Sequence, residues 1–241
     1  MGEVFITRRG GGSSSKLPQP IFTYSGGAYE STIDENTGEW EITFTSSGTL
    51  TFNNNNPYKY IDIFLVGGGG GNGNTKSVTD KSGSGGSGKT FTYLGLPITN
   101  GTEYAIEIGA GSNMPSSNSG TTQGGYTRAF GYEAAGGYSG HKNDGGDGGS
   151  GGADAAGTIQ AIDGADGQDT TTSAGTAGEG QGTTTRAFGM TNGKLFATGG
   201  AQGSGPGANN TGDGAGGTPT AGVGNQGGSG VVIIRNASVS A

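Results

Sequence analysis

The sequence contains no cysteine, and its only histidine is His141. Disulfides, cysteine nucleophiles and metal sites built from several histidines are therefore excluded. Lysine and arginine together number 12 against 19 acidic residues, which gives a net charge of −7. Because nucleic-acid binding needs clustered basic side chains, we expect no nucleic-acid partner. No apolar run approaches the roughly 20 residues that span a bilayer, so we expect no membrane insertion.

The N-terminal sequence also lacks the features of a targeting segment. MGEVFITRRGGGSSS has no apolar stretch of signal-peptide length, and Ile6 breaks the myristoylation pattern. We therefore expect a protein that is made in the cytoplasm and does not leave by the general secretory route.

Glycine dominates what is present, with 58 of the 241 residues. Leucine, isoleucine, valine and phenylalanine together number only 35, a level typical of disordered or low-complexity chains. These apolar residues are not scattered, because they gather in short blocks that glycine separates. The pattern predicts a mainly β fold with a small core, large glycine-rich insertions and essentially no α-helix.

The apolar blocks have the period of β-strands. Trp40, Ile42 and Phe44 alternate with polar residues, and so do Leu50 and Phe52. Such alternation indicates strands with one buried face. The nearly continuous apolar run YIDIFLV, residues 60–66, favours a strand that is buried on both faces. Further strands are expected at Phe91–Tyr93, Tyr104–Ile108, Lys194–Ala197 and Val231–Arg235.

We assign residues 21–237 to a single β domain with glycine-rich insertions at 67–90, 109–128, 131–182 and 198–230. The glycines keep no strict G-X-Y period, which excludes collagen. Two interpretations remain: flexible segments, or extended helices with three residues per turn that pack side by side as polyglycine II. Only glycine permits such close backbone contact. The sequence TRAFG occurs twice, at 127–131 and 185–189, and this repetition favours ordered units.

The two ends of the chain are set apart from this domain. Residues 1–20 form a flexible arm, in which Phe5, Arg8 and Arg9 precede a glycine-serine run, and residues 238–241 form a short tail. The arm is either a disordered terminus or a docking peptide for a larger assembly, with these three residues as its contacts.

Two glycine motifs suggest nucleotide binding but lack its context. GSGGSGKT, residues 83–90, fits the phosphate-binding P-loop pattern, which needs a helix directly after it. The β-like FTYLGLPI follows instead. IDIFLVGGGGGNGN has the strand and glycine turn of a dinucleotide site, again without a helix. We expect neither nucleotide binding nor a cofactor.

Metal binding and catalysis have little support. The segments 141–154 and 161–169 are rich in Asp and Gly, but neither completes the calcium-binding β-helix repeat, so solvated turns are favoured and no metal site is expected. His141 stands alone among loop residues, where a productive geometry is hard to hold. We expect no catalytic residues and no enzyme activity.

Aromatic and charged residues in the glycine-rich half are the candidate site. They are Tyr126, Arg128, Tyr132, Tyr138 and His141. In one interpretation, aromatic rings wedge between glycine segments and serve as the local core. In the other, some of these residues project from loops and contact a saccharide or protein receptor.

The order of the blocks resembles a known family. WEITFTSSGTLTF, YIDIFLVGGGGG, YAIEIGAG, GGYTRAFGYEAAGG, TTTRAFG and GGSGVVIIR follow one another as in a glycine-rich domain of bacteriophage and prophage tail-associated proteins. The opening VFITRRGGG is similar to the start of the same proteins. A looser similarity exists to the glycine-rich domain of anaplastic lymphoma kinase.

This resemblance implies a jelly-roll-like β-sandwich that carries polyglycine II helices. It also implies a non-enzymatic virion protein, a tail-fibre or tail-tip adhesin that binds other tail proteins and a host surface glycan or protein. A homo-oligomer is possible under this resemblance. The alternatives are a purely structural virion part, such as a fibre spacer or capsid decoration protein, and an ice-binding or matrix protein.

Overall fold

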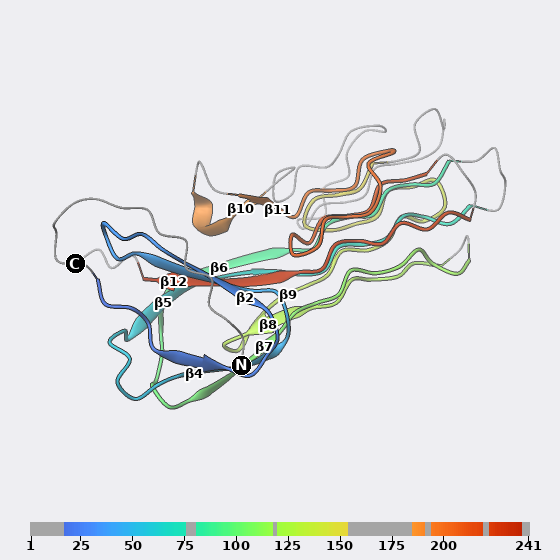
Figure 1. The fold of residues 1–241 in the computed structure, drawn as a ribbon. Coiled ribbons are helices and arrows are strands. Elements are labelled where there is room, and N and C mark those ends of the chain that lie inside the picture. The colour runs from blue at the N-terminus through green and yellow to red at the C-terminus, as the bar shows by residue number, and fades with distance from the viewer. Residues whose placement is uncertain are drawn as a thin grey trace.

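The fold is a β-sandwich with a layer of glycine-rich segments at one end (Figure 1). The computed structural model describes residues 17–75, 81–117, 120–153, 185–190, 194–218 and 222–237. Two five-stranded antiparallel sheets lie face to face. The first sheet has the order β1 (Phe22–Tyr24), β4 (Gly48–Phe52), β7 (Glu103–Glu107), β8 (Thr127–Ala129), β9 (Tyr132–Ala134). The second has the order β2 (Tyr29–Ile33), β3 (Trp40–Phe44), β12 (Val231–Asn236), β5 (Tyr60–Val66), β6 (Thr90–Pro97).

A small third sheet pairs β10 (Thr185–Arg186) with β11 (Leu195–Phe196). Between these strands lies the only helical element of the described residues, the 3-10 turn η1 (Ala187–Gly189). The expectation of a mainly β protein without α-helix is thus confirmed for the described part of the chain. The jelly-roll type is a finer statement than the strand order tests, and it stays a prediction.

The main core lies between the two large sheets. Trp40, Ile42 and Phe44 of β3 are buried, and Leu50 and Phe52 of β4 are fully buried opposite them. The intervening residues of β3 are only half-buried, as the alternation in the sequence predicts. Burial of these large side chains supplies most of the stabilisation that a chain so poor in apolar residues can obtain.

Strand β5 is buried on both faces, which confirms the prediction from its continuous apolar run. Ile61, Ile63 and Leu65 belong to the main core. Phe64 and Val66 point to the opposite face, where a second cluster includes Phe188 and Phe196. The β10–η1–β11 unit therefore covers part of the outer face of the second sheet.

The glycine-rich segments bond to one another through their backbones, with a period of three residues. In the segment 67–73, Gly67, Gly70 and Gly73 donate N–H bonds of 2.8–3.0 Å to carbonyls of residues 83–89. Gly69 and Asn72 donate instead to residues 225–228, on another side. Gly68 donates to Gly125 on a third side. Three directions in three consecutive residues match an extended helix with three residues per turn.

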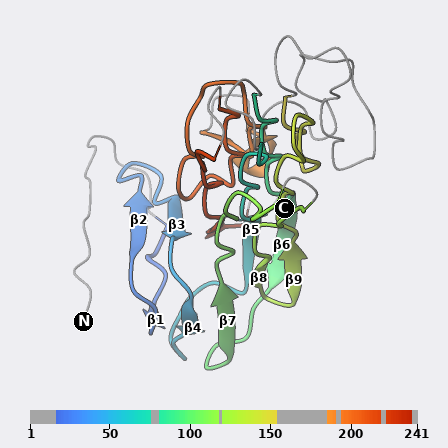
Figure 2. The ribbon, with the colours of Figure 1, turned by 90° about the vertical axis from the view of Figure 1, so that its right-hand side faces the viewer.

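The segment 82–89 repeats this pattern with other partners. The N–H groups of residues 82, 85 and 88 donate to residues 218, 215 and 212, and those of 83, 86 and 89 donate to residues 142, 138 and 135. The partner numbers fall by three or four as the donor number rises by three, so the segment 82–89 runs antiparallel to both of these neighbours. Segments 67–73 and 136–140 run parallel instead, because Gly137 donates to Gly68 and Gly140 donates to Gly71. Figure 2, turned by 90° so that the right-hand side of Figure 1 faces the viewer, shows these segments gathered into one bundle.

Glycine is required here because the backbones approach so closely. A Cβ on Gly85 would lie within 3.0 Å of the carbonyl group of Gly70, and one on Gly214 would lie 2.7 Å from the carbonyl carbon of Gly85. Other glycines have open surroundings and are needed only for their backbone conformation, such as Gly203 with φ of 77°. The layer thus contains two physically different classes of glycine.

The two TRAFG copies share one local conformation. Phe130 and Phe188 both have φ of 55°, and the glycines that follow them have φ of 82° and 69°. A left-handed backbone at a bulky residue is rare, so its recurrence supports two related units. Their surroundings differ, because Phe130 packs beside the main core while Phe188 covers Phe64 on the outer face of the second sheet.

Candidate functional site

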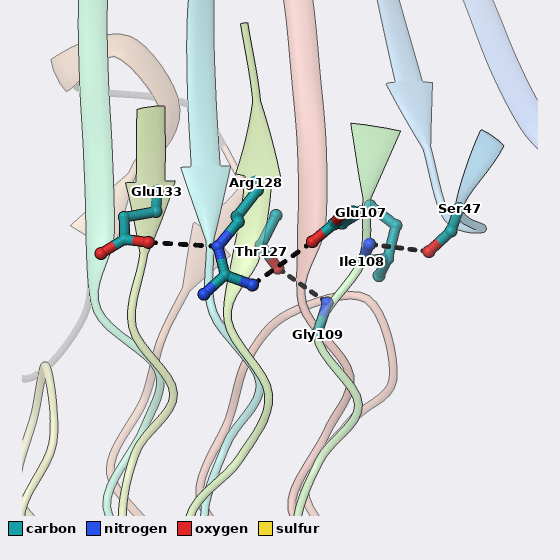
Figure 3. Close-up of polar contacts among 7 residues, drawn as sticks. All are labelled: Ser47, Glu107, Ile108, Gly109, Thr127, Arg128 and Glu133. Carbon is teal, nitrogen blue, oxygen red and sulfur yellow. Dashed lines mark hydrogen bonds and ion pairs between the residues drawn. The ribbon is translucent and has the colours of Figure 1, made fainter. Parts of the chain in front are cut away.

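Arg128 lies between two carboxylates on neighbouring strands (Figure 3). The strand register pairs Glu107 of β7 with Arg128 of β8, and Arg128 with Glu133 of β9. Arg128 Nη1 is 3.3 Å from Glu107 Oε2, and Arg128 Nε is 3.1 Å from Glu133 Oε2. The hydrogen bonds to Glu107 and then to Glu133 raise the pKa of the guanidinium above its ordinary value.

This ion-pair row borders a groove on the first sheet, which we call the Arg128 groove. It has a volume of about 390 Å³. Its charged residues are Glu103, Glu107, Arg128 and Glu133, and its aromatic residues are Tyr104, Phe130 and Tyr132. Tyr126 adds its ring beneath the guanidinium, with 4.9 Å between Arg128 Cζ and the ring centroid.

The aromatic residues of the groove are tied to the sandwich. Tyr104 and Phe130 have ring centroids 4.8 Å apart, and Tyr132 stacks on Phe91 at 4.9 Å. These contacts agree with the interpretation in which rings serve as local core, and they fix the wall of the groove. Tyr126 is more exposed than Tyr132 and is free to contact a partner.

Two side chains organise the point where β7 leaves the sheet and enters the glycine layer. Ser47 Oγ accepts a hydrogen bond of 2.9 Å from the Ile108 amide, and Thr127 Oγ1 accepts one of 3.0 Å from the Gly109 amide (Figure 3). Thr127 is fully buried. Backbone N–H groups need acceptors where a strand ends, and these two hydroxyls supply them at the end of β7. They thereby fix the position of β7 beside the Arg128 groove.

Tyr138 and His141 lie elsewhere. Both belong to the glycine layer, where the Gly86 amide donates to the Tyr138 carbonyl and the His141 Nδ1 lies 4.0 Å from Asp144 Oδ2 across a tight turn. From Ala135, where the segment leaves β9, an extended three-fold helix rises about 3.1 Å per residue, so His141 is roughly 19 Å away. Tyr138, three residues from Ala135, is roughly 9 Å away and lies between the two ends. His141 therefore lies on a distal surface, apart from the Arg128 groove with Tyr126. The predicted arm contacts Phe5, Arg8 and Arg9 lie outside the described residues.

The GSGGSGKT segment has no room for a phosphate. Every backbone N–H from Gly83 to Lys89 donates to a carbonyl oxygen elsewhere in the chain, and Gly83 to Gly88 are buried. A P-loop needs these amides free and a helix behind them. Strand β6 follows instead, as the sequence predicts.

Of the two Asp- and Gly-rich segments, 161–169 lies outside the described residues. Within the part of the chain that the structure describes, no group of three or more His, Cys, Asp or Glu side chains is arranged to hold a metal ion. None of the described helical turns is long and apolar enough to cross a membrane.

The sequence did not reveal a second set of charges, on the outer face of the second sheet. Arg235 of β12 lies between Asp62 of β5 and Glu41 of β3 in the strand register. Its Nε is 3.0 Å from Asp62 Oδ2, and Asp62 Oδ1 also accepts a hydrogen bond of 2.9 Å from the Gly95 amide. The sequence did contain a signal for this pair. The apolar strand β5 has one acidic residue and the apolar strand β12 has one basic residue, and a buried charge requires a partner of opposite sign.

Glu41 faces a groove of about 610 Å³, which we call the β2–β3 groove. It is lined by Thr32, Asp34, Glu39, Glu41, Met190 and Arg235, among others. Burial raises the pKa of the Glu41 carboxyl, and the charge of Arg235 lowers it by less. The groove therefore carries more carboxylate than its one arginine offsets.

Comparison with known proteins agrees with the composition and the fold. Residues 45–237 match the family model described as a glycine-rich domain, a span that runs from the start of the β3–β4 turn to beyond β12. A search of curated proteins finds no match. Since the matched span covers most of its length, the chain belongs to the glycine-rich domain family.

Proposed function

We propose that the chain is a non-enzymatic component of a bacteriophage tail fibre or tail tip that contacts the host cell surface. The observation that carries the proposal is the glycine layer, in which the described segments bond to one another mainly through their backbones and reach an exposed turn at residues 141–144. Such a layer, interpreted as packed polyglycine II helices on a jelly-roll-like sandwich, holds its turns at a distance from the core without needing a second core.

The receptor contact is assigned to two surfaces. The Arg128 groove offers fixed aromatic walls and a fixed charge row, which suits recognition with little ordering cost. The distal turn offers the exposed His141 side chain, and Tyr138 is exposed on the segment that leads to it. A glycan or a surface protein of the host is the expected receptor class.

A specific observation favours the structural alternative, a fibre spacer or capsid decoration protein. Two guanidinium nitrogens of Arg128 already donate to Glu107 and Glu133, so less of its hydrogen-bonding capacity remains for a ligand. In this alternative the ion-pair row ties β7, β8 and β9 together and no receptor is bound.

Cell binding separates the two functions. Purified labelled protein is incubated with a panel of bacterial cells, and bound label is measured against protein concentration. Saturable binding is the result expected of an adhesin. If the double variant Tyr126→Ala, Arg128→Ala weakens this binding and the matched exposed change Thr23→Ala does not, the Arg128 groove is the receptor contact. Loss with His141→Ala instead assigns the distal surface. Absence of binding at micromolar concentration, together with saturable incorporation into tails, overturns the adhesin function.

A further inference from the structure

Leu17, the first described residue, contacts the turn between β2 and β3, at one end of the β2–β3 groove. The Leu17 amide donates a hydrogen bond of 3.3 Å to the Thr37 carbonyl, in the turn between β2 and β3. The contact is close, because a Cβ on Gly38 would lie 2.8 Å from the Leu17 Cα. Residues 1–16 therefore continue from a point beside the same turn that supplies Asp34 to the groove.

The carboxylates of the groove outnumber its one described cation, Arg235. Arg235 gives its ion pair to Asp62, which is fully buried. Glu39 and Glu41 form no ion pair within 4.0 Å among the described residues. Asp34 Oδ1 only accepts hydrogen bonds from the Asn36 and Thr37 amides of its own turn. A half-buried carboxylate such as Glu41 gains from a cation that approaches it.

Three parts of the chain outside the described residues adjoin this region. Residues 191–193 follow Met190 and read TNG, and residues 238–241 lie beyond Asn236 and read SVSA, so neither brings a charge. Residues 1–16 bring Arg8, Arg9 and Lys16, together with the apolar Val4, Phe5 and Ile6. Charge complementarity therefore selects the N-terminal arm.

We propose that the β2–β3 groove is a docking site for the N-terminal arm of the same chain, with Arg8 and Arg9 facing the groove carboxylates. The reach is sufficient, because the eight residues from Arg9 to Leu17 span up to about 26–29 Å when extended. Phe5 then has an apolar contact available at Met190, whose side chain is partly exposed in the groove. The arm covers the part of the outer sheet face that the β10–η1–β11 unit leaves open.

This inference does not depend on the proposed function, since it concerns an intramolecular contact. The chain contains no cysteine, so a disulfide between two introduced cysteines reports on that contact alone. We pair Thr7→Cys beside the two arginines with Thr32→Cys, an exposed groove residue of β2. The control pairs Thr7→Cys with Thr23→Cys, an exposed threonine of β1 on the other sheet that is closer to the arm in sequence.

Under mild oxidation, the groove pair should form an intramolecular disulfide in about tenfold higher yield than the control pair, because docking raises the effective concentration of the two thiols. Arg8→Ala with Arg9→Ala, or high salt, should reduce that yield toward the control. Equal yields at Thr32 and Thr23, or no disulfide with either, overturn the proposal. A disulfide found only between two chains, with a yield that rises with concentration, also overturns it and assigns the groove to the arm of a second copy. Unchanged thermal midpoints of the reduced variants show that the fold is intact in each comparison.

Discussion

Asp62 and Arg235 form an ion pair across strands β5 and β12, with 3.0 Å between Asp62 Oδ2 and Arg235 Nε. The Asp62 side chain is 1% exposed and that of Arg235 is 19% exposed. The Arg235 guanidinium also lies 4.1 Å from the centre of the Phe188 ring. One contact network thus joins β12 to β5 and to the unit that covers them.

Breaking this pair should be costly. Asp62→Ala is expected to lower the free energy of unfolding by about 3–5 kcal/mol, because it removes the buried carboxylate that pairs with the Arg235 guanidinium. Asp62→Asn should cost less, since it keeps the acceptor for the Gly95 amide. Urea unfolding measures both. Glu133→Ala, which breaks an exposed pair with Arg128, is the matched control and should change little; an equal loss for Glu133→Ala would contradict the assignment.

Trp40→Ala tests the main core. Trp40 is 2% exposed and packs edge-on against Tyr58 at 5.2 Å between ring centroids. Removal of the indole should lower the free energy of unfolding by about 3–5 kcal/mol through lost burial and the cavity left behind. Near-native stability in denaturant unfolding would show that β3 does not face the core as described.

The two classes of glycine predict opposite responses to substitution. Gly214→Val should unfold the chain, because any Cβ there collides with the backbone of Gly85. Gly203→Asn lies in the same glycine-rich half but has open space and φ of 77°, a conformation that Asn tolerates, so it should stay folded. Circular dichroism and thermal unfolding of the two variants make the comparison. If both fold equally well, the glycine layer is not closely packed.

Alkaline pH should destabilise the chain through Tyr24. Burial raises the pKa of its hydroxyl above 10.0, and the hydrogen bond to the Ser46 carbonyl accompanies that burial. Because the pKa of Tyr24 is higher in the folded than in the unfolded chain, its contribution to the free energy of unfolding is fully present below pH 10. That contribution is lost as the pH rises through the folded-state pKa. Stability measured from pH 8 to pH 11 should therefore fall less steeply in Tyr24→Phe. Tyr60→Phe, at an exposed tyrosine, should retain the full slope.

Mg-ATP should not bind at GSGGSGKT. The amides that a phosphate needs already donate to carbonyls within the layer, and opening them would disrupt several segments at once. Addition of millimolar Mg-ATP should leave the thermal midpoint unchanged, with and without Lys89→Ala. A rise in midpoint that Lys89→Ala abolishes would restore nucleotide binding as a function.

The sequence predicts the large strands because burial leaves a local signature. The alternation around Ile42 and the continuous run around Phe64 each report their environment within a few residues. Strands β8 and β9 were not predicted because three residues are too short for any period to appear. Strand β2 was missed for another reason, since its inward-facing Tyr29, Ser31 and Ile33 are only half-buried and include a polar residue.

The candidate site is less predictable because it depends on contacts that are distant in sequence. Tyr126 and Arg128 are close neighbours and were found together, whereas Glu107 and Glu133 join them only through strand pairing. His141 was grouped with them by proximity in sequence, and the extended path of the glycine segment separates it. The partners of each glycine segment leave little side-chain pattern in the sequence, because backbone groups make most of the bonds.

The side-by-side course of the extended glycine segments has a mechanical consequence. Their hydrogen bonds run between neighbours that lie side by side, so a pull on the distal turns, resisted at the sandwich, acts along the segments and across the bonds. Many bonds then share the load in shear, instead of opening one after another from an end. A layer of this kind should transmit force from its tip to its base with little stretching, and most of the bonds that resist the force are between backbone groups.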